Sequence, residues 1–377
     1  MKILFDCRYT RITRHDGISR FTAGLVTALA KLHPVTMMIN DTRQLELLPD
    51  LPWVMGPSPT AITEPLAALY FNRYTPDVVY SPMQTMGPWG RTFGLVTTVH
   101  DLIYYSNRTP PRNLAWPVRI VWRAYHLWWG PQRGLLGRAD AHVAVSETTK
   151  ELMVSNRLTP HPITVISDAV DEPASTRQAP ATTRDLVYMG SFMPYKNVEL
   201  LGRALHLLPG YHLHLLSRAT ADDRARLERV APPGSLTFHG GVDDAAYARA
   251  LASAFALVSA SRNEGFGLPV LEAMASGTPV AVSDIEVFRE IAGDAAVFFN
   301  PDSPESFANA IVSLEDPNEW MQRSRQVVEQ ARPYRWDHSA ALLLEVLTQV
   351  HSDRQKRPAR EKRAATEESD RQVDPTP

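Results

Sequence analysis

A rhythm of short apolar runs, separated by longer amphipathic segments, constrains the fold of this 377-residue chain more than any other feature. The rhythm occurs twice. Short apolar runs alternating with helical patterns are typical of strand-helix-strand units in a parallel sheet, so two α/β doubly wound domains are expected. The strands of the two series are predicted at residues 2–5, 35–39, 77–80, 95–99 and 141–145, and at residues 186–189, 211–216, 235–238, 256–258 and 279–282.

A stretch rich in Pro, Ala and Thr, residues 171–183, separates the two series and is predicted to be the interdomain linker. We therefore expect a first Rossmann-like domain over residues 1–172 and a second over residues 183–335. The apolar periodicity predicts a last helix over residues 336–351. Residues 352–377 contain almost no large apolar side chain, so we expect a disordered tail there.

Composition excludes several classes of protein. The formal net charge of −2 and the pI near 6.6 give no sign of a nucleic-acid partner. The first residues contain no apolar core of a signal peptide, and no apolar run approaches the roughly 18 to 20 residues that span a bilayer. We expect a cytoplasmic protein, with contact at the inner face of the membrane left open. The single cysteine excludes an intrachain disulfide.

The segment NEGFGLPVLEAMASGTPVAVSD, residues 263–284, predicts an anion site. Gly265 and Gly267 allow close backbone approach, Pro269 suits a first helical turn, and Gly277 suits a helix end, so a helix is expected over residues 269–276. Its unpaired N-terminal amides would carry partial positive charge and could hold a pyrophosphate without a basic side chain.

Two glutamates flank this loop and supply hydrogen-bond acceptors. Glu264 in the loop and Glu272 on the helix could accept hydroxyl groups on either side of the anion, such as those of a sugar ring and a ribose. In the alternative interpretation, Glu264 caps the helix, Glu272 is solvated and the glycines serve only a turn. The residues alone leave both interpretations open.

The Glu-x7-Glu spacing, with GFGLP inside it and EAMASGTPV following, resembles the donor-site signature of the family 4 retaining glycosyltransferases, including bacterial mannosyltransferases. The resemblance implies a GT-B architecture, in which two facing Rossmann-like domains enclose a central cleft and the last helix returns to the first domain. It also implies transfer of a hexose, mannose or glucose, from a GDP- or UDP-sugar to a glycan or lipid-linked hydroxyl in cell-envelope polysaccharide synthesis.

The resemblance assigns roles to particular residues of the second domain. Glu264 would orient the sugar and Glu272 the ribose, while the amides of Gly265, Phe266, Gly267 and Leu268 would meet the diphosphate. No cofactor is implied, and the absence of an Asp-x-Asp motif agrees with a reaction that requires no metal.

A second phosphate-contact motif is matched in part by LVYMGSFMPYKN, where Gly190 ends a strand and Lys196 begins the next helical pattern. Lys196 would neutralise the leaving diphosphate. Many family members carry arginine where Ser191 stands, so less positive charge is available. Arg262 is a candidate substitute, and a plain surface role for it is equally compatible with the sequence.

Other positions follow predicted strands, where ligands of such sheets bind. His100 would contact the sugar from the first domain, and Gly17 would let backbone approach the phosphate or acceptor. Gly241 and Val242 correspond to the backbone that reads the nucleotide base. Asp168 stands where the family usually has asparagine, and it receives no role. A strand-end histidine and a simple turn at Gly17 remain the structural alternatives.

Residues 116–133 contain four tryptophans and several basic residues at helical spacing. A basic amphipathic helix of this kind suits a membrane interface or a lipid-linked acceptor. Burial against the domain core explains the same pattern equally well. Two further functional alternatives also stay open: another nucleotide-sugar GT-B enzyme, and a GT-B subunit that binds a sugar nucleotide without catalysis. An NAD-dependent enzyme lacks its glycine fingerprint after the first strand.

Overall fold

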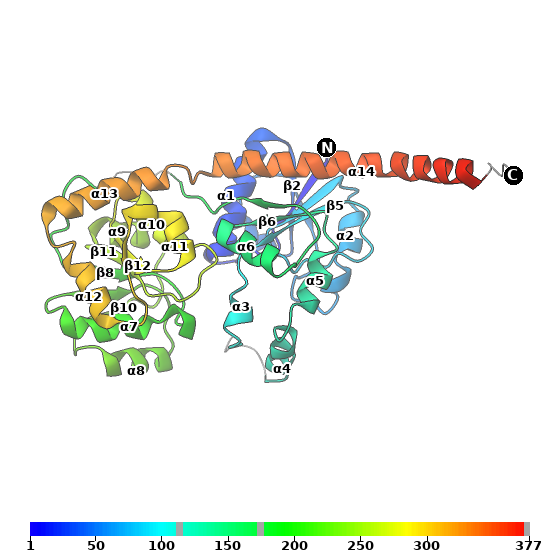
Figure 1. Cartoon of the computed structure of the whole chain (residues 1–377). Helices are drawn as coiled ribbons and strands as arrows, with labels where there is room; N and C mark the ends of the chain where they lie inside the picture. The colour runs from blue at the N-terminus through cyan, green and yellow to red at the C-terminus, as the bar shows by residue number, and fades with distance from the viewer. Residues whose placement is uncertain (111–115, 172–176, 373–377) are drawn as a thin grey trace.

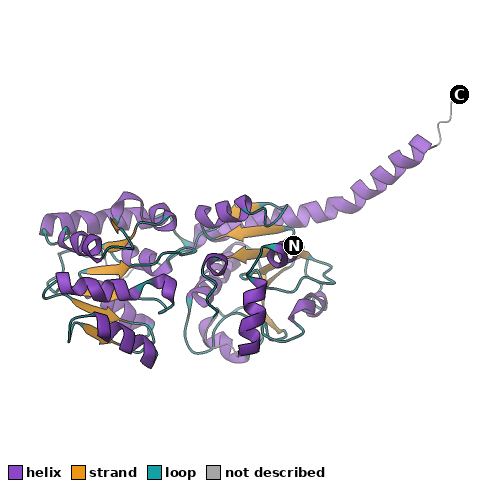
Figure 2. Cartoon of the chain, turned by 60° about the horizontal axis from the view of Figure 1, so that its bottom comes forward, coloured by secondary structure: helices purple, strands orange, loops and turns teal. Residues whose placement is uncertain are grey.

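The computed structural model describes residues 1–110, 116–171 and 177–372, with side chains to residue 356 except at residue 117. The chain forms two α/β lobes connected side by side, and a long C-terminal helix passes over the first lobe (Figure 1). Figure 2 shows the same two lobes from below, each with its strands enclosed by helices. Part of the predicted linker, residues 172–176, lies outside the described residues.

The first domain is built on a seven-stranded parallel sheet with the order β3-β2-β1-β4-β5-β6-β7. Several central strands are buried along their whole length, which explains their unbroken apolar sequences. The strands are β1 (Ile3–Asp6), β2 (Val35–Ile39), β3 (Trp53–Met55), β4 (Val78–Ser81), β5 (Gly94–Val99), β6 (Ala141–Ala144) and β7 (Ile163–Val165). The helices are α1 (Gly17–Leu32), η1 (Thr42–Leu47), η2 (Glu64–Leu66), α2 (Ala68–Asn72), α3 (Ile103–Ser106), α4 (Trp116–Tyr125), α5 (Gly130–Leu136) and α6 (Glu147–Ser155).

The second domain repeats this plan with a six-stranded parallel sheet ordered β10-β9-β8-β11-β12-β13. Its strands are β8 (Asp185–Tyr188), β9 (His212–Leu215), β10 (Leu236–Phe238), β11 (Ala256–Ser259), β12 (Val280–Ser283) and β13 (Val297–Phe299). Its helices are η3 (Pro194–Lys196), α7 (Val198–Ala204), η4 (Leu205–Leu207), α8 (Ala221–Val230), α9 (Asp244–Ser253), α10 (Leu268–Ala275), α11 (Glu286–Ala292), η5 (Gly293–Ala295), α12 (Pro304–Val312) and α13 (Pro317–Ala331).

Strand order reverses beside β1 in the first sheet and beside β8 in the second, so each domain has the doubly wound topology expected. Every strand predicted from the sequence is present, with ends shifted by at most two residues. Three further strands, β3, β7 and β13, were not predicted. Each is three residues long and lies at the edge of its sheet, so its apolar run is too short to reveal a strand.

The last helix, α14 (Trp336–Gln372), returns to the first domain and packs along α1 and against β4 and β5. The prediction of a disordered tail from residue 352 was wrong for residues 352–372. Arg354 is still docked, since its Nη2 donates to the Thr92 carbonyl at 3.0 Å. The segment is rich in Glu, Arg, Lys and Ala, which favour helix without an apolar face. Residues 373–377 lie outside the described part.

The predicted helix over residues 116–133 is two helices, α4 and α5, interrupted after Tyr125. This break divides the tryptophans. Trp122 packs edge-on against Tyr104 with ring centroids 4.9 Å apart, and Trp129 stacks on Tyr105 at 3.7 Å. Trp116 and Trp128 remain exposed, at 73% and 65%. Within the described residues, no helix combines the length and the apolar character needed to cross a membrane.

Candidate functional site

The glycine loop before α10 is fixed against the first domain. The Gly265 carbonyl accepts a hydrogen bond of 2.7 Å from Ser146 Oγ, and the same hydroxyl caps the N-terminus of α6. A Cβ at position 265 would lie 1.9 Å from the carbonyl oxygen of His100, so only glycine fits. The donor loop predicted in one domain therefore meets the strand end predicted in the other.

A second cross-domain contact caps α6 from α11. The Glu290 carboxylate accepts from the amides of Glu147 and Thr148, at 2.7 and 2.9 Å, and from the Thr148 hydroxyl at 2.7 Å. A carboxylate at a helix N-terminus satisfies unpaired amides and complements the helix dipole. Together with the Ser146 contact, this capping joins the two domains beside the glycine loop.

The N-terminus of α10 is free of side-chain capping. Gly267 occupies the N-cap position with φ of +108°, a conformation that side chains rarely adopt. The interpretation of Glu264 as a helix cap was therefore wrong. The first amides of α10 face the loop without a side-chain acceptor, which is the arrangement that binds anions. The helix begins and ends within one residue of the predicted bounds.

Lys196 and Glu264 form an ion pair between Lys196 Nζ and Glu264 Oε1, with side chains only 17% and 12% exposed. Ser261 Oγ also donates to Glu264 Oε1, at 2.8 Å. These residues line a small cavity of about 50 Å³ together with Gly190 and Gly267. The structure thus brings together the lysine, the loop glutamate and the start of α10, which are distant in sequence.

Glu272 lies on α10 beside a larger cavity of about 400 Å³, and its side chain is only 14% exposed. The interpretation of Glu272 as solvated was therefore wrong. Burial raises the pKa of Glu272 to about 7, and the nearby Arg20 guanidinium and Tyr247 hydroxyl offset part of the increase. Arg20 Nε lies 3.4 Å from Glu272 Oε1.

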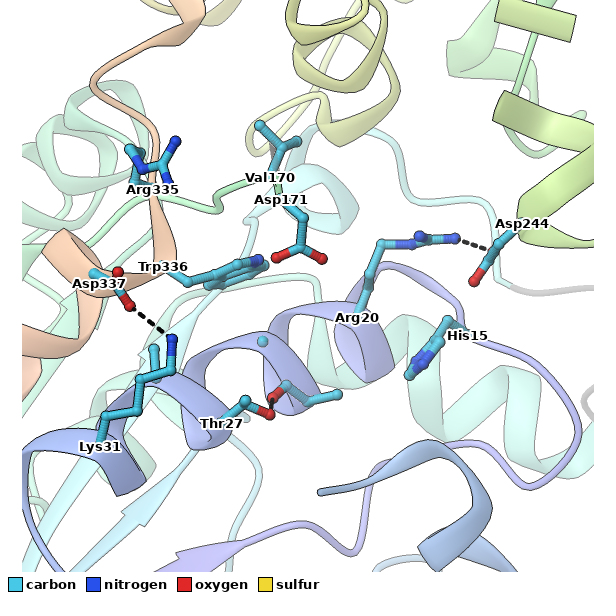
Figure 3. Close-up of a pocket in the computed structure, with 13 residues that line it drawn as sticks. His15, Arg20, Thr27, Lys31, Val170, Asp171, Asp244, Arg335, Trp336 and Asp337 are labelled. Carbon is cyan, nitrogen blue, oxygen red and sulfur yellow. Dashed lines mark hydrogen bonds and ion pairs between the residues drawn. The ribbon is translucent and has the colours of Figure 1, made fainter. Parts of the chain in front are cut away.

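Arg20 crosses from α1 to the second domain, where its Nη2 contacts Asp244 Oδ1 at 2.5 Å. Figure 3 shows Arg20 extended toward Asp244, with His15 beside them and Trp336 across an adjoining cavity. Sequence reasoning did not identify Arg20. Its position in the first turn of the helix that follows β1 was the available signal, because that turn lies at the carboxyl end of the sheet.

His100 lies at the end of β5, as predicted. Its Nε2 is 2.8 Å from the Pro82 carbonyl, and the Phe21 ring packs edge-on at 4.9 Å. Burial lowers the pKa of His100 to about 4. With Nε2 as the donor to Pro82, Nδ1 is left as an acceptor for a ligand hydroxyl. The predicted sugar contact remains a prediction.

The other predicted site positions differ in the groups that they can present to a ligand. Gly17 begins α1 with open space around it. Gly190 donates its amide to Ser217 Oγ at 3.0 Å. Phe266 is buried and Val242 packs on the core, so they present backbone rather than side chains. Gly241 has φ of +99°.

Two other charged residues near the site are Arg262 and Asp168. The Arg262 guanidinium forms an ion pair with Asp302 at the surface, which agrees with the surface role that the sequence also allowed. Asp168 is buried, and burial with the nearby Glu272 charge raises its pKa to about 7. Of the described residues, no three His, Cys, Asp or Glu side chains are arranged to hold a metal ion.

Comparisons with known proteins agree with this geometry. The family profile "Glycosyltransferase Family 4" matches residues 15–172, and "Glycosyl transferases group 1" matches residues 183–316. The O-antigen chain mannosyltransferase RfbU of Salmonella typhimurium is 53% identical over 62 residues, 16% of this chain and 18% of that protein. The O-antigen chain mannosyltransferase B of Escherichia coli is 33% identical over 162 residues, 40% of this chain and 42% of that protein.

These alignments span less than half the length of either relative. Among solved structures, sucrose-phosphate synthase from Thermosynechococcus elongatus superposes with a TM-score of 0.73 at 18% identity, covering 94% of this chain and all of that one. The superposition confirms the two-domain GT-B fold. Because the two profiles match the two domains in turn, this chain belongs to the family 4 glycosyltransferases.

Proposed function

We propose that this chain transfers mannose, with retention at the anomeric carbon, from GDP-mannose to a glycan or lipid-linked hydroxyl in cell-envelope polysaccharide synthesis. The observation that carries the proposal is the Lys196–Glu264 pair beside the uncapped start of α10. The names of the similar O-antigen mannosyltransferases favour mannose. UDP-glucose is the second donor to test.

The ion pair suggests how the site would respond to a donor. Lys196 would exchange its Glu264 partner for the diphosphate, so its charge would be directed at the leaving group. Glu264, once released, would accept hydroxyl groups of the sugar. The α10 amides are fixed dipoles that need no reorganisation as the diphosphate departs. All of these steps use side chains and backbone of the chain itself, so the proposal requires no metal.

Closure of the two domains would protect the sugar from hydrolysis. Ser146 already binds the Gly265 carbonyl, and Glu290 already caps α6 from the second domain. A closed cleft excludes water and strengthens the electrostatic interactions inside it. The acceptor would then enter from the first domain, beside His100.

A donor screen tests the proposal. The protein without added metal is titrated with GDP, GDP-mannose, UDP and UDP-glucose, and Tm is measured. A true donor at 100 times its Kd should stabilise the fold by about 2.7 kcal/mol. Glu272→Ala removes the ribose acceptor and should weaken binding about 10- to 100-fold. Glu286→Ala, at an exposed position on α11, is the matched control.

Three outcomes of the screen can be distinguished. Stabilisation that depends on Glu272, followed by mannose release or transfer, would support the proposed reaction. Donor binding without turnover for any acceptor would indicate a binding subunit instead. No response to any nucleotide or nucleotide sugar would contradict the function proposed here.

We also propose that the surface formed by α4 and the following turn contacts the cytoplasmic membrane. Trp116, Val121 and Trp128 are 73%, 69% and 65% exposed, and Arg119 and Arg123 are on the same helix. Exposed tryptophans with neighbouring arginines suit an anionic lipid interface. Trp122 and Trp129 pack on α3, so they would anchor this surface to the domain.

Vesicle flotation tests the membrane contact. The wild-type chain should float with vesicles containing anionic phosphatidylglycerol and much less with phosphatidylcholine alone. The double variant Trp116→Ser/Trp128→Ser should lose most of this binding, because it removes the exposed apolar area. Trp53→Ser changes a tryptophan that is 42% exposed on edge strand β3, and it should bind like wild type. Equal flotation of both variants would contradict the assignment.

A further inference from the structure

Two arginines from opposite domains converge on Gly241. Arg14 lies in the loop before α1, and Arg218 follows β9. Arg14 Nη1 is 2.7 Å, and Arg218 Nε 3.3 Å, from the point that a Cβ at Gly241 would occupy. The two atoms are therefore at most about 6 Å apart. Two positively charged guanidinium groups therefore face each other across the cleft.

Neither guanidinium is neutralised by a neighbouring acid. Across residues 1–110, 116–171 and 177–372, no carboxylate forms an ion pair with Arg14 or Arg218. The acids nearest in sequence to Gly241 are already engaged. Asp243 caps α9 through the Ala246 amide at 2.7 Å, and Asp244 pairs with Arg20. Paired cations without a counter-charge suit an anionic ligand.

The arginine pair is next to the donor site rather than remote from it. Ser217, the residue before Arg218, holds the Gly190 amide through its hydroxyl at 3.0 Å. Gly241 in turn donates to the carbonyl of Leu216 at 3.0 Å. The pair thus lies beside the Gly190 turn.

The other positive charges at the site are already paired, including Arg20, which contacts both Asp244 and Glu272. Ser191 follows Gly190 without a basic group, Arg262 pairs with Asp302, and the Lys196 charge is shared with Glu264. A nucleoside diphosphate brings at least two negative charges. We propose that Arg14 and Arg218 clamp the diphosphate of the donor, one from each domain, and replace the basic residue absent at position 191. This inference rests on the proposed function.

Because one arginine belongs to each domain, a bound diphosphate would add to the Ser146 and Glu290 contacts that already join the two domains. The guanidinium groups repel one another when the site is empty, and an anion between them converts that repulsion into two attractions. Arg14 would contribute from the first domain, whereas Arg218 is on the same domain as Lys196.

Calorimetric titration tests the clamp with GDP and UDP as the nucleotide probes and inorganic pyrophosphate as a competitor. The variants are Arg14→Gln, Arg218→Gln and their combination, with Arg203→Gln, at an exposed position on α7, as the control. Each clamp substitution should weaken nucleoside diphosphate binding about 10-fold or more, and should weaken pyrophosphate competition to a similar degree. The control should bind like wild type. Both arginines are exposed, so the melting temperatures without ligand should match.

Two results would overturn the clamp while leaving the proposed function intact. One is wild-type affinity for GDP or UDP in both single variants. The other is weaker nucleotide binding with unchanged pyrophosphate competition, which would show that the arginines stack on the base instead. Failure of the wild type to bind GDP or UDP would contradict the clamp and the proposed function together.

Discussion

Replacing Lys196 by alanine is expected to lower kcat for sugar transfer by about 10² to 10³, the loss typical when one charged stabiliser of a leaving group or oxyanion is removed. The physical reason is that Lys196 is the cation placed beside both Glu264 and the start of α10. KM for the donor should change less than kcat, because the negative charge on the diphosphate grows as the bond to the sugar breaks. Initial rates at saturating donor measure both quantities.

Lys150→Ala provides the control for this experiment. Lys150 pairs with Glu147 on the surface of α6, and its removal should leave kcat within about twofold of wild type. The Lys196→Ala variant leaves Glu264 partly buried without its partner, so assays belong well below the Tm of the variant. Full activity in the folded Lys196→Ala protein would remove the lysine from the mechanism.

Asp168→Asn is expected to stabilise the fold, and the gain should increase with pH. Burial, with a smaller contribution from the Glu272 charge, raises the pKa of Asp168 to about 7, whereas an unfolded chain has a value near 3.8. The folded protein therefore retains a proton that the unfolded chain releases. Below about pH 4, Asp168 does not lower the free energy of unfolding. As the pH rises from there to about 7, the destabilisation caused by the buried carboxylate grows. At pH 8 the variant should gain about 2 to 4 kcal/mol in the free energy of unfolding.

Urea unfolding of wild type and Asp168→Asn at several values between pH 4 and pH 8 measures this dependence. Asp171→Asn is the matched control, because Asp171 is an exposed carboxylate in the same segment and should show little change. A gain independent of pH would show that the amide stabilises by a new hydrogen bond rather than by removing a buried charge. A loss of stability at pH 8 would contradict the electrostatic explanation.

The donor half of the site could be predicted from the sequence because most of its residues lie close together in the chain. Gly265, Gly267 and Glu272 lie within one strand-loop-helix unit, where turn chemistry and helix geometry determine the arrangement. The resemblance then connected this unit with Lys196, which the structure places in contact with Glu264. The two parallel sheets were likewise predictable, because central strands buried on both faces have continuous apolar sequences.

Contacts between the domains were not predictable in the same way. Arg20 and Glu272 are 252 residues apart, and the Glu290 carboxylate reaches amides 142 and 143 residues earlier. No periodic pattern reports which surface charges meet after two domains close. The raised pKa of Asp168 has partly the same origin, since the charge of Glu272, 104 residues later in the chain, contributes to it. The extension of α14 over residues 352–372 was not predicted because the amphipathic periodicity ends near residue 351. Beyond that point only the helix propensity of the individual residues favours a helix.

The return of α14 has a consequence for biosynthesis. Leu343 and Leu347 of this helix are fully buried with the core residues that include Phe21 and Leu25 of α1. The ribosome delivers these leucines only after the whole second domain has been made. The first domain therefore stays open along one side throughout translation of the second, and its unpaired apolar surface is a natural substrate for chaperones until the final helix emerges.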